Sequence, residues 1–333
     1  MCLEEDNEML LPAIVLHEAG DPDQLRFEDV SVASPGPGEV QIQHTAIGVN
    51  FHDVYVRSGL YTTLPLPGVP GLEAAGVVIA TGPGATRFKA GDRVAYITKQ
   101  YGAYSTARVI DENLLIPVPD SISDVLAAAH LIKGLTAYAL SHDVYAVKPG
   151  DHVLVHAAAG GVGSLLCQWA AAKGAIVIGT VGSARKAELA VKQGCSHVIL
   201  YREQDFVKRV EEITRGEGVQ VAYDSVGRDT FFGSLACLAR SGHLANFGQS
   251  SGPVPPFEVS QLFPRSNSVS RLSLFAHLYR ADARHRLAQQ LFSALLDGTL
   301  NPGPIEQFKL AEAPDAHRAL ESRERLNSLV LIP

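Results

Sequence analysis

Three small residues at a regular spacing could bring the protein backbone close to a pyrophosphate. Ala158 ends the apolar run at residues 153–158, and together with Gly160 and Gly163 it occupies the fixed places of a G-x-G-x-x-G turn. Glycine permits a sharp turn and a close backbone approach, and the N–H groups at the start of the following helix attract an anion. A second apolar run at residues 175–181 completes the pattern of a dinucleotide site. Its expected backbone contacts are Gly160, Gly161, Val162 and Gly163.

The end of the second apolar run indicates which dinucleotide is bound. An NAD site usually carries an acidic residue about 20 residues beyond the turn, where it binds the ribose hydroxyls, but residues 175–186 contain no carboxylate. Gly182 and Ser183 instead leave room and offer hydrogen bonds for a 2′-phosphate, and Lys186 supplies a positive charge, with Arg185 the weaker candidate. We therefore expect NADPH rather than NADH. The alternative for Lys186 is an ordinary exposed helix lysine.

The elements around this turn are expected to alternate between strands and helices. Apolar runs begin at residues 153, 175, 197, 220 and 242, and helical patterns lie between them at Val162–Lys173, Ala184–Gln193, Asp205–Thr214 and Thr230–Ala239. Alternation of this kind is typical of a doubly wound parallel sheet with helices on both faces. Ser268–Phe275 would add a sixth strand, and a further helix is expected over Asp282–Leu296.

The first third of the chain has a different pattern. Short β-rich runs, among them residues 11–20, 25–32 and 39–50, are separated by turns rich in glycine and proline. Many short strands with frequent turns indicate a barrel-like or rolled sheet. A helical stretch follows at residues 123–147. The short β segments near the C-terminus need neighbours, so we expect the chain to return to this first domain.

Composition limits the class of protein. The 333 residues are 46% hydrophobic and 19% charged, which indicates a folded globular chain of two domains. The net charge of −7 disfavours a broad nucleic-acid surface. The four cysteines lack CxxC spacing, so we expect buried thiols and a cytoplasmic protein. The apolar run at residues 9–16 follows an acidic segment, which disfavours a signal peptide, and no run is long enough to span a membrane.

Several motifs resemble one known family. They are GVNFHDVYVRSGLY at residues 48–61, IKGLTAY at 132–138, HAAAGGVG at 156–163, GTVGSARK at 179–186, YRE at 201–203, YDSVGRDT at 223–230 and the terminal ESR…SLVLIP. They are similar to the quinone oxidoreductase branch of the medium-chain dehydrogenase/reductase superfamily, which includes the zeta-crystallin-like proteins. The resemblance covers nearly the whole chain. It implies a GroES-like β-rich catalytic domain over residues 1–134 and 277–333, a Rossmann NADPH-binding domain over residues 135–276, a cleft between them, and NADPH-dependent reduction of quinones by a dimer.

The resemblance also assigns cofactor contacts one by one. Tyr201 would lie beside the adenosine phosphate with Lys186, and Asn50 and Thr136 would line the nicotinamide side. Further contacts follow strand ends, where an open α/β sheet binds its ligand; they are Ser225, Phe247, Gly248 and Ser250.

Two arginines complete this set of contacts. Arg271 and Arg323 are similar to family arginines that face the cofactor, and a surface position is the alternative for Arg323. The family commonly has Gly-Lys shortly after its terminal Ser-Arg, whereas this chain has Asn327 and Ser328 near that point. A lysine contact is therefore not expected there.

Zinc-dependent members of the superfamily place a cysteine where this chain has Asn50, and a histidine before glutamate where it has Leu72 and Glu73. Asparagine and leucine cannot replace thiolate and imidazole as zinc ligands. No cysteine occurs between Cys2 and Cys167 to hold a structural zinc ion. We therefore predict a protein without zinc.

Without a metal, a quinone is a suitable acceptor because it is electrophilic and its ring stabilises the reduced anion. The protein must bring the nicotinamide and the acceptor to within roughly 3–3.5 Å and place a donor near the developing oxyanion. Candidate catalytic residues are Asn50, through its amide N–H, and Tyr55 and Tyr61, through their phenols and aromatic faces. Asp53 would orient a neighbour. The alternative is that the tyrosines only pack the loop and solvent delivers the proton.

Two other functions stay open. A reductase of activated C=C bonds, such as enones or alkenals, would use the same hydride, fold and metal-free site. A cofactor-binding structural or RNA-binding protein is the alternative of another class, which the acidic balance and the lack of a basic-aromatic cluster disfavour. A homodimer is expected through strand 268–275, because pairing would cover an exposed sheet edge. The preferred acceptor and the one- or two-electron outcome do not follow from the sequence.

Overall fold

The computed structural model describes residues 9–322 and 326–333, and residue contacts divide them into two compact units. Unit 1 takes the described residues up to Ile132, Arg280–Ala288 and those from Gly303 onward. Unit 2 takes Lys133–Tyr279 and Gln289–Pro302. One unit is β-rich and the other holds a parallel sheet, as the sequence predicted.

Unit 1 is built from strands because its sequence alternates short β-rich runs with glycine and proline turns. The strands are β1 (Met9–Leu16), β2 (Leu25–Val32), β3 (Glu39–Val49), β4 (Glu73–Thr81), β5 (Arg93–Ile97), β6 (Ala107–Asp111), β7 (Leu115–Pro117), β14 (Ile305–Lys309) and β15 (Ser328–Ile332). A seven-stranded sheet has the order β14-β15-β3-β4-β5-β7, with β6 also paired to β3, while β1 pairs with β2.

The C-terminal strand supports the segment that carries the first candidate site. Leu329 of β15 pairs antiparallel with Val49 of β3, directly before helix α1 (Phe51–Arg57). Ile47, Val49 and Leu329 belong to one buried apolar cluster, against which helix α9 (Ala313–Glu321) also packs. The end of β3 is therefore fixed on both sides.

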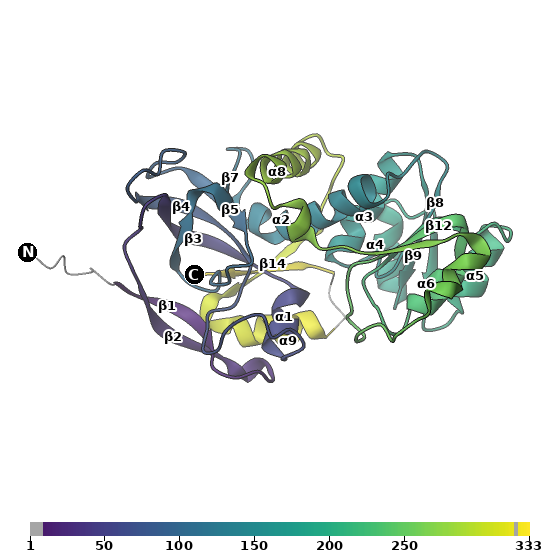
Figure 1. The fold of residues 1–333 in the computed structure, drawn as a ribbon, viewed down its shortest axis with the longest axis horizontal. Coiled ribbons are helices and arrows are strands. Elements are labelled where there is room, and N and C mark those ends of the chain that lie inside the picture. The colour runs from purple at the N-terminus through teal and green to yellow at the C-terminus, as the bar shows by residue number, and fades with distance from the viewer. Residues whose placement is uncertain (1–8, 323–325) are drawn as a thin grey trace, which may run out of the picture. The chain divides into compact units, whose positions relative to one another are not determined.

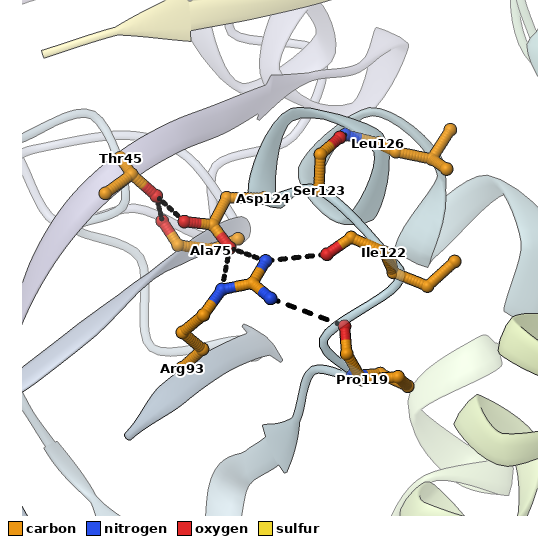
Figure 2. A network of polar contacts seen from close by, with 8 residues as sticks. All are labelled: Thr45, Ala75, Arg93, Pro119, Ile122, Ser123, Asp124 and Leu126. Carbon is orange, nitrogen blue, oxygen red and sulfur yellow. Dashed lines mark hydrogen bonds and ion pairs between the residues drawn. The ribbon is translucent and has the colours of Figure 1, made fainter. Parts of the chain in front are cut away.

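A polar network around Arg93 anchors the start of helix α2 (Asp124–Tyr138) within unit 1, as Figure 2 shows. Arg93 Nε donates to Asp124 Oδ1 at 3.1 Å, and Arg93 Nη2 donates to the Ile122 carbonyl at 2.6 Å. Asp124 Oδ2 accepts from Thr45 Oγ1 at 2.7 Å. Because Thr45 lies on β3 and Arg93 on β5, the first turns of α2 are tied to two strands of the sheet.

Unit 2 contains the parallel sheet that the alternating pattern predicted. Its strands are β8 (His152–Val155), β9 (Ile176–Val181), β10 (His197–Leu200), β11 (Val219–Asp224), β12 (Leu238–Asn246) and β13 (Ser268–Arg271), in the order β10-β9-β8-β11-β12-β13. All of their pairings are parallel. Leu154, Ile178 and Leu244 are fully buried between the sheet and its helices.

The helices of the chain's second half have the bounds α3 (Gly161–Ala172), α4 (Ala184–Lys192), α5 (Phe206–Ile213), α6 (Phe231–Ala236), α7 (Leu274–His277) and α8 (Ala281–Leu296), and a π-helical turn at Ala139–Val144 follows α2. Helices α5 and α6 lie side by side (Figure 1). A Cβ atom on Gly233 would lie 2.3 Å from the Phe206 ring, so glycine permits this close packing.

Two predicted elements were too long. Helix α6 ends at Ala236 rather than Ala239, because Leu238 already pairs with Val219 in the sheet. Strand β13 ends at Arg271 rather than Phe275, because its neighbour β12 ends at Asn246 and offers no further partner. None of the helices within residues 9–322 and 326–333 has the length and apolarity that a membrane span requires.

Candidate functional site

The glycine turn after β8 has a geometry that only glycine permits. A Cβ atom on Gly163 would lie 2.3 Å from the carbonyl oxygen of Ala157, and one on Gly161 would lie 2.8 Å from Lys133 Cδ. Ala157 itself has φ of 51°, a left-handed conformation uncommon for a residue with a side chain. Gly160 is the N-cap of α3, and Val162 lies in its first turn, so free backbone N–H groups point out of this turn.

The residues predicted for the 2′-phosphate gather at the end of β9. A Cβ atom on Gly182 would lie 2.8 Å from Tyr201 Oη, so the missing side chain lets the tyrosine lie across this strand end. Tyr201 is 46% exposed. Ser183 caps α4 and accepts a hydrogen bond from the backbone N–H of Lys186. Two hydroxyl groups and the first turn of the helix that carries Lys186 therefore meet at this corner.

Arg202 is a residue of this corner that sequence reasoning missed. Its Nε would lie 3.4 Å from a Cβ atom on Gly182. The available signal was its position beside Tyr201 in the YRE motif. The strand end thus has two basic residues, Lys186 and Arg202, where an NAD site would have a carboxylate.

The remaining predicted cofactor contacts of unit 2 lie together beyond β11 and β12. The Ser250 N–H donates to the Ser225 carbonyl at 3.3 Å, and a Cβ atom on Gly248 would lie 2.4 Å from that same oxygen. The Phe247 N–H donates to Asp224 O, and Arg271 Nη1 donates to Gly248 O at 2.9 Å. These contacts form a folded loop at the carboxyl end of the parallel strands.

A buried polar network under this loop was not predicted. Asp224 is fully buried and accepts hydrogen bonds from the Gly227 N–H at 2.9 Å and from Thr230 Oγ1 at 2.8 Å. Ser234 Oγ lies 3.2 Å from Asp224 Oδ2 and 2.9 Å from His156 Nε2. Burial lowers the pKa of His156. The network joins the ends of β8 and β11, and so fixes the strand ends that carry the loops.

Unit 1 brings the predicted residue Asn50 between two fully buried carboxylates. The Asn50 backbone N–H donates to Asp53 Oδ2 at 2.8 Å, and Asn50 Nδ2 donates to Glu73 Oε1 at 2.6 Å. Glu73 Oε2 accepts from the Ile132 backbone N–H at 2.7 Å. The predicted orienting role of Asp53 therefore has a direct contact, whereas Glu73 was noted in the sequence only as the neighbour of Leu72.

A second pair of buried residues extends this network. Tyr104 Oη donates to Asp53 Oδ2 at 3.2 Å and lies 3.0 Å from His317 Nε2. Because a carboxylate only accepts, the tyrosine proton faces Asp53 and His317 Nε2–H must donate to Tyr104. Burial and the Asp53 carboxylate raise the pKa of Tyr104 well above its ordinary value, and burial lowers the pKa of His317 to about 3. Both groups are therefore neutral near pH 7.

The two predicted tyrosines lie in one aromatic cluster beside Asn50 in the sequence. The ring centroids of Tyr55 and Tyr61 are 5.2 Å apart, and His52 lies 5.3 Å from Tyr61. His52 Nε2 is 2.9 Å from Tyr101 Oη. Burial lowers the pKa of His52 to about 4, so the ring is neutral. Partly exposed rings of this kind offer a face on which a flat acceptor could stack.

Two predicted cofactor contacts remain, Thr136 and Arg323. Thr136 lies on α2 in the part of that helix that belongs to unit 2. Arg323 lies outside the described residues.

Known protein families match segments of both units. The GroES-like domain of alcohol dehydrogenases matches residues 36–120, and a family described as zinc-binding dehydrogenase matches residues 161–291. A GroES-like unit joined to a Rossmann unit defines a medium-chain dehydrogenase/reductase.

Three individual relatives narrow this class. Quinone oxidoreductase 1 of Escherichia coli is 44% identical over 96% of this chain and 99% of its own length. A 2-haloacrylate reductase of Burkholderia is 43% identical over 97% of this chain and 99% of its own length. The crystal structure of Escherichia coli quinone oxidoreductase complexed with NADPH superposes with a TM-score of 0.93 and 44% identity, covering 97% of this chain and all of that one. The chain belongs to the quinone oxidoreductase family.

The residues present do not fit the zinc ion that the description of the second domain implies. The Asn50 amide donates one N–H to Glu73, and an amide nitrogen with hydrogens offers no lone pair to a metal. Leu72 is fully buried and has no ligating atom. Across residues 9–322 and 326–333, no group of three or more His, Cys, Asp or Glu side chains could hold a metal ion.

Proposed function

We propose that this protein reduces quinones by hydride transfer from NADPH. The observation that carries the proposal is the end of β9, where Gly182 lies against Tyr201 and is followed by Ser183 and Lys186, with no carboxylate. A 2′-phosphate would find room and positive charge there, whereas the ribose hydroxyls of NADH would lack their usual acidic partner. The similarity to quinone oxidoreductases, one of them complexed with NADPH, supports the same cofactor and acceptor.

In this proposal the loops of unit 2 bind and orient the cofactor. The turn Gly160–Gly163 would hold the pyrophosphate through backbone N–H groups, while Lys186 and Tyr201 would hold the 2′-phosphate. The loop residues Ser225, Phe247, Gly248 and Ser250, together with Thr136, Arg271 and Arg323, would complete the contacts. When bound, NADPH supplies a hydride from its nicotinamide ring.

Unit 1 supplies the polar and aromatic groups for the acceptor. Asn50 would donate its amide N–H near the acceptor oxygen as negative charge develops. Tyr55 and Tyr61 would hold the quinone ring through their faces and provide phenol donors. The hydride delivers two electrons, and the reduced oxygen takes its proton from a phenol or from solvent.

A turnover screen tests the proposal. NADPH and NADH are compared against a series of quinones and a series of enones, and the protein is analysed for zinc. We expect faster turnover with NADPH than NADH, faster turnover with quinones than enones, and no stoichiometric zinc. NADH preference, or one zinc ion per chain, would contradict the cofactor or the metal assignment.

Reduction of activated C=C bonds is the second candidate, favoured by the 43% identity to a 2-haloacrylate reductase. Faster turnover of enones in the same screen would select it. Salt-sensitive RNA binding without any reductase activity would instead select the structural or RNA-binding alternative.

We further propose a cytoplasmic homodimer that pairs through β13. This strand ends the sheet order of the described part of unit 2, and the neighbouring 3-10 helix Val259–Arg265 exposes 75% of Val259 and 85% of Phe263. Joining two edges would cover backbone groups and these side chains. Sedimentation should show a dimer at micromolar concentration that Phe263→Asp weakens, whereas the control Phe232→Asp, on α6, should leave it intact.

A further inference from the structure

The burial of two carboxylates around one asparagine needs an explanation. Glu73 and Asp53 are both fully buried, and each accepts a hydrogen bond from Asn50. Burying a charge is costly unless good hydrogen bonds compensate it. Gly48 belongs to the same arrangement, because a Cβ atom there would lie 2.3 Å from Glu73 Oε1 and 2.4 Å from the Ala128 carbonyl. The fold thus makes space for a buried carboxylate beside Asn50.

The chemistry of Glu73 decides which way the Asn50 amide faces. A carboxylate accepts hydrogen bonds and cannot donate them, so the atom 2.6 Å from Glu73 Oε1 must be the amide nitrogen. The second oxygen of Glu73 is held by the Ile132 N–H, which prevents the carboxylate from turning. An amide nitrogen carries two hydrogens, and Glu73 takes one. The second hydrogen is the donor that Asn50 can offer to a ligand.

We propose that Glu73 is a positioning residue for hydride transfer, which holds the Asn50 amide so that its second N–H faces the reacting ligand. This inference rests on the proposed function, in which Asn50 donates to that ligand. Asp53 holds the Asn50 backbone by accepting its N–H, and Tyr104 in turn holds Asp53 by donating its hydroxyl hydrogen. Glu73 is the member of this network that contacts the amide itself.

Glu73→Gln tests the proposal with a nearly unchanged shape. If the new amide oxygen keeps the Ile132 N–H, its NH₂ group meets the NH₂ group of Asn50, and two donors cannot bond. The Asn50 amide must then turn over and withdraw its N–H from the ligand. We expect kcat to fall by about 10- to 100-fold, as for a displaced or lost donor, while KM for NADPH stays within about twofold because the proposed phosphate contacts lie in unit 2.

The double variant N50D/E73Q separates positioning from structural support. The introduced glutamine can donate to the introduced carboxylate and still accept from the Ile132 N–H, so the hydrogen bond returns with its direction reversed. We expect a melting temperature close to that of Glu73→Gln, in which the turned Asn50 amide accepts the same hydrogen bond, while kcat stays low because no N–H is left for the ligand. A wild-type kcat in this folded double variant would show that the reaction needs no N–H from residue 50, and would overturn the proposal.

A readout without cofactor or acceptor completes the test. In protein labelled with ¹⁵N-asparagine, the Asn50 side-chain amide should show protection from hydrogen exchange that Glu73→Gln removes. Glu112→Gln is the matched control, since Glu112 is a buried carboxylate of unit 1 that accepts the backbone N–H groups of Thr86 and Arg87. It should lower the melting temperature and leave kcat unchanged.

The outcomes distinguish a failure of the proposed function from a failure of the positioning role of Glu73. If wild-type protein reduces no quinone with NADPH, the proposed function fails. If wild-type protein is active and folded Glu73→Gln keeps its full kcat, the proposed function stands and the role of Glu73 is wrong.

Discussion

The two units place their candidate site residues by different physical means. In unit 2, most of the candidate cofactor contacts lie in loops. Gly163 and Gly182 permit the close packing of these loops because they lack a side chain. In unit 1, one polar side chain is fixed by other buried polar side chains, as Asn50 is by Glu73 and Asp53. Binding a long, charged cofactor suits repeated backbone contacts, whereas a reaction step needs one donor held at one orientation. The comparison predicts that changes in unit 2 affect cofactor affinity and changes in unit 1 affect turnover.

The largest expected effect in unit 2 comes from adding one methyl group to the glycine turn. Gly163→Ala would place a Cβ atom 2.3 Å from the backbone oxygen of Ala157. Relieving this clash costs about 1–3 kcal/mol and moves the N–H groups of the turn, so NADPH should bind about 10- to 100-fold more weakly. Titration by nicotinamide fluorescence measures the change. Gly303→Ala is the control, because its Cβ atom would make an ordinary 3.5 Å contact with Leu326 O; it should alter affinity less than about twofold.

Removing the lysine at the end of β9 should change cofactor preference. Lys186→Ala would remove the proposed charged contact to the 2′-phosphate, so KM for NADPH should rise about tenfold, while KM for NADH stays the same. Steady-state kinetics with both cofactors measures the ratio. Lys192→Ala, at the exposed end of the same helix, is the control. An unchanged KM for NADPH in Lys186→Ala would show that the assignment is wrong.

His317, a buried histidine of unit 1, should affect the pH dependence of stability. The pKa of His317 is about 3 in the folded protein and about 6.5 in an unfolded chain, so between these values the unfolded state binds more protons. The free energy of unfolding should therefore fall as the pH drops below about 6.5, and His317→Gln should reduce this slope by up to about 1.4 kcal/mol per pH unit. Urea unfolding of both proteins at pH 5 to 7 measures the slope, and an equal slope in the two would contradict the expectation.

The smallest expected effect concerns the phenols. Tyr55→Phe and Tyr61→Phe keep the aromatic cluster and remove only a hydroxyl, so each should lower kcat by about 2- to 10-fold, the value of one hydrogen bond. Stopped-flow measurement of hydride transfer records this loss. Tyr279→Phe, whose ring is 76% exposed, is the control. If both variants turn over at the wild-type rate, the tyrosines have no part in the chemistry.

The same contrast explains what could be predicted from the sequence. The parallel sheet followed from regular alternation, and the glycine turn followed from residues within six positions of one another. A glycine that permits a tight turn acts on residues close to it in the sequence, so a short motif predicts it. The ends of α6 and β13 were wrong because each depends on where a neighbouring strand stops, which is a property of the sheet rather than of the segment.

The network around Asn50 could not be derived in that way, because its members are far apart in the chain. Tyr104 and His317 are separated by 213 positions, and Asn50 and Glu73 by 23. One signal was available, since Glu73 opens the otherwise apolar run of β4, where a charge is seldom buried without a partner. The identity of that partner depends on the pairing of strands and helices, which no local pattern contains.

The pairing of β15 with β3 has a consequence for folding during synthesis. Val49, next to Asn50, is covered by Leu329, which leaves the ribosome about 280 residues later. At a synthesis rate of about 5–20 residues per second, β3, the strand before Asn50, stays without its neighbour β15 for roughly 14–56 s. The sheet of unit 2 has all its strands within residues 152–271 and can assemble earlier. A nascent chain should therefore acquire the capacity to bind a nucleotide before the segment around Asn50 is ordered.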